Sequence, residues 1–163
     1  RGRTGGREGW GGRGRRVEAK ASDGGTVGEA PLEPTRIYVK AVLDLIAAIT
    51  PGEIDGISHI TGSGLLNVPR LKKDVRYVFD TPLPVPVILT EIQQWGNVAH
   101  DEMYRTFNMG MGLCVIVPGR HEAKAVEVLS KHFPSQRVGS VLPGTGVSVP
   151  SNGIELTGAE EHF

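Results

Sequence analysis

The feature that most constrains this chain is a strand, a glycine turn and a short helix in immediate succession over residues 54–70. Residues 54–60 are apolar, with enough alternation to predict a buried strand. The run breaks at the Gly-Ser-Gly of residues 62–64 and resumes as an apolar turn of helix. A fold built around this stretch places a loop at the end of a buried strand, where backbone N–H groups can face an anion.

Polar groups gather around this turn and make it the first candidate site. The residues that we expect to face a ligand are His59, Thr61, Gly62, Ser63, Gly64 and Asn67. His59 would act as a hydrogen-bond donor or a proton shuttle near neutral pH. The alternative is a plain strand-to-helix turn that needs glycine only for a positive φ. The spacing matches neither the P-loop pattern nor the dinucleotide fingerprint, so from spacing alone both interpretations stay open.

A second candidate precedes another apolar run. Arg105 and Asn108 stand among bulky apolar residues in 103–112, directly before the run at 113–117. A polar group in such a place must be paired or must face a cleft, and ligands often bind at strand ends. The alternative pairs Arg105 with the acidic residues 101–102 and uses Asn108 to cap a turn.

The rest of the pattern alternates helices and strands. We predict helices over 34–49 (with Pro34 in the first turn), over 86–95 with Gly96 as the C-terminal cap, from residue 97 or 100 through 105, and over 121–132. We predict strands over 54–60, 74–80, 113–117 (a central strand covered on both faces) and 136–141, and a hairpin joining 147–149 to 154–156. The prolines of 81–86 predict an extended connector. The expected fold class is α+β, a mixed β-sheet packed with helices.

Composition divides the chain of 163 residues into a domain with two tails. Residues 1–26 are rich in Arg and Gly and are predicted to be a disordered tail, a linker or a non-native segment. Residues 27–157 form the predicted domain, and 158–163 a C-terminal tail. Of the 18 basic and 18 acidic residues, seven bases and two acids lie in residues 1–20, so the remainder is acidic by about five charges.

Several function classes are excluded or disfavoured by composition. The acidic domain is not expected to bind nucleic acid, although a basic tail on RNA is kept as an alternative. Cys114, the one cysteine, is expected to be a buried thiol without a disulfide partner. No metal-ligand spacing, membrane span or secretory signal is present, so we expect no metal bound by a Cys or His cluster and a cytoplasmic location. His121 and His132 are expected to be ordinary surface residues.

Three stretches, taken in order, resemble one enzyme family. They are residues 32–40 (LEPTRIYVK), 59–70 (HITGSGLLNVPR) and 102–112 (EMYRTFNMGMG). Together they resemble the C-terminal domain of phosphoribosylformylglycinamidine cyclo-ligase, also called aminoimidazole ribonucleotide (AIR) synthetase. The family usually has a third glycine where Ser63 stands, and often Glu-Asn where only Asn67 appears. The family's N-terminal domain has no counterpart in residues 1–26.

The resemblance implies an ATP-dependent ligase of purine biosynthesis. ATP phosphorylates the formyl amide oxygen of formylglycinamidine ribonucleotide, and an internal nitrogen displaces phosphate to close the imidazole ring. It implies ATP and Mg²⁺ as cofactors, a cleft that excludes water, and His59 as a proton-transfer or polarising group.

By the same resemblance, the nucleotide substrate would contact the loop at 61–64 together with Asn67, Arg105 and Asn108. It also implies a partner N-terminal domain and a homodimer in the full-length enzyme, so the isolated chain is expected to be inactive. The alternatives are a related ATP-using enzyme, of the selenophosphate synthetase or thiamine-phosphate kinase type, and a non-catalytic binding module.

Overall fold

The computed structural model describes residues 35–157. The predictions for the tails at 1–26 and 158–163, for Pro34 and for an RNA-binding tail therefore lie outside the described residues. The helices and strands below all belong to one compact unit, Arg36–Phe163. None of the helices in the described part of the chain is long and apolar enough to cross a membrane.

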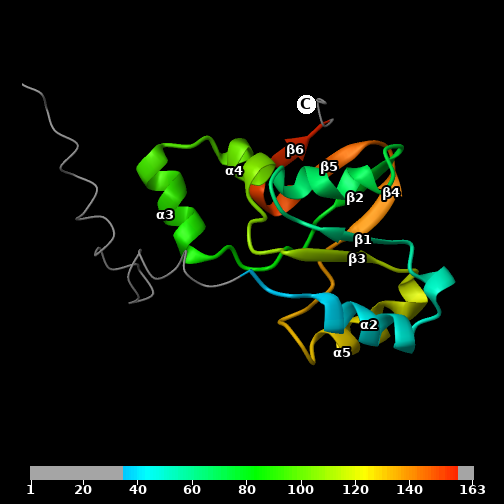
Figure 1. Ribbon diagram of the computed structural model, residues 1–163. Coiled ribbons are helices and arrows are strands. Elements are labelled where there is room, and N and C mark those ends of the chain that lie inside the picture. The colour runs from blue at the N-terminus through cyan, green and yellow to red at the C-terminus, as the bar shows by residue number, and fades with distance from the viewer. Residues whose placement is uncertain (1–34, 158–163) are drawn as a thin grey trace, which may run out of the picture. The chain divides into compact units, whose positions relative to one another are not determined.

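Within residues 35–157, six strands form two separate sheets (Figure 1). The smaller sheet pairs β1 (Gly56–His59) with β3 (Leu113–Ile116) in antiparallel register. The larger has the order β4-β2-β5-β6, with the bounds Ser140–Pro143, Val75–Val78, Gly146–Val149 and Ile154–Leu156. Within it β2 and β5 run parallel, while the other two pairs are antiparallel. The α+β class with mixed pairing is confirmed.

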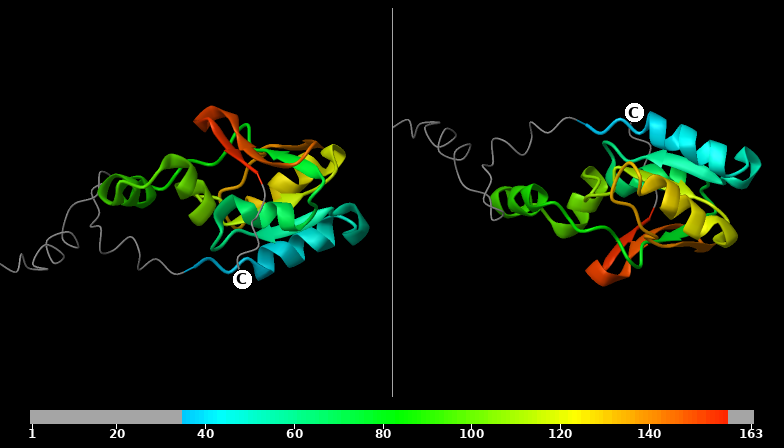
Figure 2. Two further views of the ribbon diagram at one scale, coloured as in Figure 1. Left: turned by 90° about the horizontal axis from the view of Figure 1, so that it is seen from above. Right: turned by 90° about the horizontal axis from the view of Figure 1, so that it is seen from below.

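Four α-helices and four short 3₁₀-helices are described. The α-helices are α2 (Val39–Ala48), α3 (Val87–Gly96), α4 (His100–Thr106) and α5 (Glu122–Leu129). The 3₁₀-helices are η2 (Pro51–Glu53), η3 (Gly64–Arg70), η4 (Gly119–His121) and η5 (Pro150–Asn152). Helices α2 and α5 pack against each other, as the view from below in Figure 2 shows. Helix α4 packs against η3 and β6.

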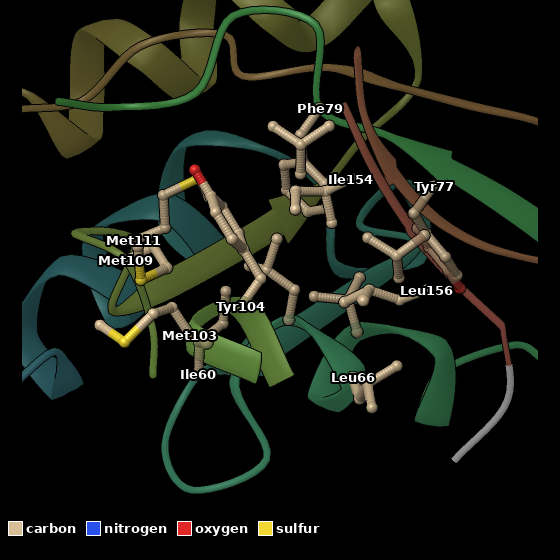
Figure 3. Close-up of a cluster of buried hydrophobic side chains, with 14 residues drawn as sticks. Ile60, Leu66, Tyr77, Phe79, Met103, Tyr104, Met109, Met111, Ile154 and Leu156 are labelled. Carbon is tan, nitrogen blue, oxygen red and sulfur yellow. The ribbon is translucent and has the colours of Figure 1, made fainter. Parts of the chain in front are cut away.

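Two apolar clusters lie on opposite faces of β3. Cys114 and Ile116 pack against the main cluster, and Val115 and Val117 against a smaller one under α2 and α5. In Figure 3 the Tyr104 ring lies within the main cluster, with methionines to one side and Ile154 and Leu156 to the other. Fourteen buried residues make up that cluster, so it supplies most of the apolar burial that stabilises the fold.

The prediction for 113–117 is confirmed in its two covered faces and wrong in its central position. Among the described strands β3 pairs only with β1. Its other edge faces a cavity of about 460 Å³ that lies between β2, β3, α5 and residues 134–141. Apolar periodicity reports burial of the two faces and is silent about hydrogen bonding along the edges, so the sequence could not distinguish the two arrangements.

Three element boundaries differ from the predictions. Residues 35–38 are not helical, and α2 begins at Val39. The strand predicted over 136–141 is displaced to β4, which begins at Ser140, and the side chain of Gln136 donates to the carbonyl of Thr81 at 2.8 Å. The left-handed residue that ends α3 is Asn97 (φ 50°) rather than Gly96.

The histidines expected on an open surface are both paired with carboxylates. His121 Nε2 lies 2.8 Å from Glu53, and His132 Nε2 lies 2.9 Å from Asp44. Their side chains are 23% and 17% exposed, so the expectation of ordinary surface residues was wrong. The two pairs fasten α2 and η2 to the two ends of α5. The partners lie tens of residues away, so no local pattern could reveal them.

Candidate functional site

The loop after β1 is locked by the packing of Gly64 against α4. Gly64 has φ +49°, a conformation that L side chains rarely adopt. A methyl group at this position would overlap the carbonyl oxygen of Tyr104 and lie 2.7 Å from that of Phe107. The two candidate motifs therefore meet at this glycine, backbone against backbone, and no larger residue fits between them.

Asn67 closes the same loop from inside. Asn67 is a buried residue, only 7% exposed. The amide nitrogen donates to the carbonyls of Gly62 and Gly64, both at 2.8 Å, and approaches that of Thr61 at 3.4 Å. Since an amide group carries two hydrogens, these contacts use its donors on the loop itself. Asn67 therefore shapes the loop and holds it.

The tip of the loop is exposed. Thr61, Gly62 and Ser63 all lie on the surface, and a methyl group on Gly62 would meet nothing within 4 Å. Ser63 adopts the left-handed conformation with φ 72°, and its hydroxyl accepts a hydrogen bond from Arg70 at 3.3 Å. A position that the resembling family fills with glycine thus has the backbone that favours glycine here. The exposed tip leaves these groups accessible to a ligand.

Arg105 and Asn108 make internal contacts. Arg105 Nε lies 4.0 Å from the carboxylate of Asp101, one helical turn earlier, and the arginine side chain is 35% exposed. The side-chain oxygen of Asn108 accepts a hydrogen bond from the backbone of Gly110 at 3.0 Å. These contacts match the alternative in which an ion pair and a turn account for both residues. The backbone of Arg105 nevertheless lies beside Gly64, so α4 and the loop form one surface.

His59 ends β1 with an exposed side chain. The ring of Tyr38 meets it edge to face, with centroids 5.6 Å apart and planes inclined at 70°. The same tyrosine contacts Phe133 at 5.0 Å. Sequence reasoning missed this cluster because its members come from three distant segments. The one local signal is the position of Tyr38 inside the first resembling stretch.

Among the described residues we find neither a reactive thiol nor a group of metal ligands. Burial raises the pKa of the Cys114 thiol to about 11, so at neutral pH it is protonated and a poor nucleophile. Burial likewise raises the pKa of Tyr104. Within residues 35–157, no group of three His, Cys, Asp or Glu side chains could hold a metal ion. The cavity beside β3 is lined by none of the loop residues 59–67.

A family model and curated relatives match this chain. The model for the C-terminal domain of AIR synthase related proteins matches residues 4–151. A phosphoribosylformylglycinamidine cyclo-ligase from Methanopyrus kandleri is 47% identical over 140 residues, which cover 86% of this chain and 40% of the relative. One from Methanocaldococcus jannaschii is 42% identical over 144 residues, covering 87% and 39%. The chain thus spans about two fifths of the length of these relatives.

Solved structures with the same fold are more distant in sequence. Escherichia coli HypE, a hydrogenase maturation protein, has a TM-score of 0.57 at 13% identity, with 91% of this chain and 44% of HypE covered. A chain of a HypE–HypF complex gives a TM-score of 0.56 at 15% identity, with 88% of this chain and 50% of that chain covered. At this level of identity the likeness concerns the fold alone.

Proposed function

This chain belongs to the AIR synthase related family, as its C-terminal domain, and we propose that it is the C-terminal part of a phosphoribosylformylglycinamidine cyclo-ligase. The reaction would convert formylglycinamidine ribonucleotide and ATP to aminoimidazole ribonucleotide, ADP and phosphate. The observation that carries the proposal is the 47% identity with a relative of that name over 140 residues. The rigid, exposed loop at the end of β1 supports it, because ring closure needs a fixed set of polar groups.

In this proposal the exposed tip meets the ligand and the buried residues hold the tip. Backbone N–H groups of residues 61–63 would contact phosphate oxygens of the nucleotide substrate, with Gly64 holding the tip from below, and His59 would donate or transfer a proton at the formyl amide. Asn67 would act through the carbonyls that it holds. Arg105 and Asn108 would border the site from α4 and the turn that follows it.

We infer that the complete reaction needs groups beyond this chain, because the chain spans about two fifths of the length of the relatives. ATP phosphorylates the amide oxygen, the internal nitrogen then attacks the same carbon, and the C–O bond to the phosphorylated oxygen breaks to release phosphate. Mg²⁺ would neutralise charge on ATP, but the described residues offer no metal site, so no step is assigned to the metal on this chain. We therefore propose a partner N-terminal domain, a homodimer in the complete enzyme, and no turnover by the chain alone. The cytoplasmic location stays a prediction.

The test is an assay for AIR formation in two forms of the protein. The 163-residue chain alone should show no turnover, whereas the chain joined to the part of the Methanopyrus kandleri relative that precedes the matched region should be active. His59→Ala in the joined protein should lower kcat by about 10²- to 10⁴-fold, the usual contribution of a general acid or base. His121→Ala, which removes an imidazole from the α2–α5 layer, is the matched control and should keep its turnover. Turnover by the isolated chain would refute the need for a second domain, and full activity of the His59 variant would remove His59 from the mechanism.

A further inference from the structure

Tyr38 connects three segments that are distant in the sequence. It directly precedes α2, His59 ends β1, and Phe133 follows α5. The Tyr38 ring contacts both other rings edge to face, at 5.6 Å and 5.0 Å between centroids, with planes inclined at 70° and 62°. The guanidinium of Arg36 lies over the Phe133 ring, 5.8 Å from its centroid. Of the aromatic side chains in this cluster, Tyr38 alone contacts both of the others.

The backbone next to His59 is shaped to receive Tyr38. The Tyr38 hydroxyl occupies the space in which any side chain at residue 112 would have to begin, and the ring carbon that bears the hydroxyl would lie 3.1 Å from such a Cβ. Gly112 has no positive φ, so this close approach accounts for a glycine there. The carbonyl of Gly112 in turn accepts a hydrogen bond from the N–H of Ile60 at 2.9 Å. Tyr38 therefore packs against the backbone of the β1–β3 pair, in which β1 ends at His59.

An exposed imidazole without neighbours samples several rotamers, and each extra rotamer dilutes the reactive one. An edge-to-face contact between rings favours one orientation by roughly two- to tenfold. Because the Tyr38 ring is itself held between Phe133 and Gly112, it is a fixed support rather than a second mobile side chain. The contact leaves His59 exposed, so the support does not bury the group that it orients.

We propose that Tyr38 is a positioning residue for His59, which acts by holding the imidazole in one orientation beside the loop at 61–64. The inference rests on the proposed function in so far as His59 takes part in the reaction. Its structural half, that Tyr38 and the space above Gly112 fix the ring of His59, stands on the contacts alone.

The first experiment measures the orientation in the 163-residue chain without any activity. Imidazole proton signals of His59, assigned by NMR with the His59→Gln variant, are compared across Tyr38 variants. Tyr38→Leu should remove the ring-current shift that the tyrosine imposes on these signals, while Tyr38→Phe should retain most of it. Trp95→Leu, which removes an exposed aromatic ring from α3, should leave the signals in place. Unchanged His59 signals in Tyr38→Leu would overturn the proposal.

The second experiment measures turnover in the chain joined to the preceding part of the Methanopyrus kandleri relative. Tyr38→Leu should lower kcat by up to about tenfold and change KM by less than about twofold, since the orientation of a proton-transfer group affects the chemical step more than binding. Gly112→Ala should show a similar loss because its methyl group displaces the hydroxyl. The double variant Gly112→Ala with Tyr38→Phe should recover most of the activity, because it lacks the tyrosine hydroxyl that would overlap the added methyl group.

The outcomes separate the inference from the proposed function. If His59→Ala is fully active, the proposed role of His59 fails, and the NMR comparison alone decides whether Tyr38 orients the ring. If His59→Ala is inactive but Tyr38→Leu folds and keeps its full kcat, the positioning role is refuted and the role of His59 stands. If Tyr38→Leu does not fold, the Gly112→Ala and Tyr38→Phe pair decides, and the absence of recovery in the double variant contradicts the inference.

Discussion

The protein fastens distant segments together in two different ways. At the junction of η3 and α4, Gly64 packs backbone against backbone and Asn67 closes the loop with buried hydrogen bonds. In the α2–α5 layer, α2 and η2 are joined to the ends of α5 by side-chain contacts between the half-buried His132 and His121 and the more exposed carboxylates of Asp44 and Glu53. Buried backbone packing tolerates almost no substitution, while exposed pairs are screened by water and salt. The rigid junction of η3 and α4 lies under the candidate site, whereas the weaker histidine–carboxylate contacts lie in the α2–α5 layer.

Gly64→Ala should disrupt the packing of η3 against α4 and have the largest effect on stability. The substitution requires a left-handed alanine and a displacement of the Tyr104 carbonyl, which is backbone and cannot rotate away. We expect a loss of roughly 3 kcal/mol in the free energy of unfolding, from about 1–2 kcal/mol of strain and about 1–3 kcal/mol of overpacking. Urea denaturation measures it. Gly62→Ala, at an open position two residues earlier, is the control and should change stability by less than about 1 kcal/mol.

Asn67→Ala should give the next largest effect. It leaves the partly buried carbonyl of Gly62 and the buried carbonyl of Gly64 without their donor, which costs about 1–3 kcal/mol. The loss should appear in urea denaturation and also as faster amide exchange in residues 61–64, since the loop would loosen locally. A variant as stable as the parent, with an unchanged exchange rate, would mean that the amide does not hold the loop.

Ser63→Gly, a substitution in the rigid loop, should raise the free energy of unfolding. Ser63 carries a positive φ of 72°, and glycine adopts this conformation without the strain that a Cβ introduces. Against the strain of about 1–2 kcal/mol stands the extra flexibility of glycine in the unfolded chain, so a net gain of roughly 0.5–1 kcal/mol is expected. Thermal unfolding measures it. Ser63→Ala keeps the strain and loses only the exposed hydrogen bond from Arg70, so an equal gain in that variant would contradict the conformational explanation.

Removing the carboxylates of the α2–α5 layer should have the smallest effect on stability, and this effect should depend on pH. The hydrogen bond from Lys40 and then that from His132 lower the pKa of Asp44, while the hydrogen bond from Arg120 and then the charge of His121 lower the pKa of Glu53. Carboxylates with lowered pKa values stabilise the fold above their ordinary values of 3.8 and 4.5, and this contribution is lost as the pH falls through the lowered values.

The double variant Asp44→Asn with Glu53→Gln tests this contribution. It should unfold at a slightly lower temperature than the parent at neutral pH, and the difference should disappear as the pH falls through the lowered pKa values and shrink in about 1 M salt. Because both carboxylates are exposed, the difference should stay below that of Asn67→Ala. A difference that persists in acid would mean that packing, rather than charge, joins α2 to α5.

The candidate site was identified from the sequence in part. The stretch at 59–67 was found as a loop between a strand and a short helix, and the structure has that loop. Which of its polar groups face outward was not predictable. Asn67 turns its amide into the loop while Thr61 and Ser63 remain exposed, because the direction of a side chain depends on which carbonyls the folded backbone brings within reach. The functional roles of all these residues stay predictions.

The sequence by itself determined what depends on near neighbours. The helix at α5, the strand at β2 and the hairpin of β5 and β6, with Gly153 at φ 66°, follow from periodicity and turn chemistry. The three resembling stretches were likewise sufficient to find the family. Only the tertiary structure decided the division into two sheets, the parallel pairing of β2 with β5, the conflict at Gly64, and the contact of Tyr38 with His59. Those features join residues far apart in the chain, and packing selects among pairings that local propensity leaves equivalent.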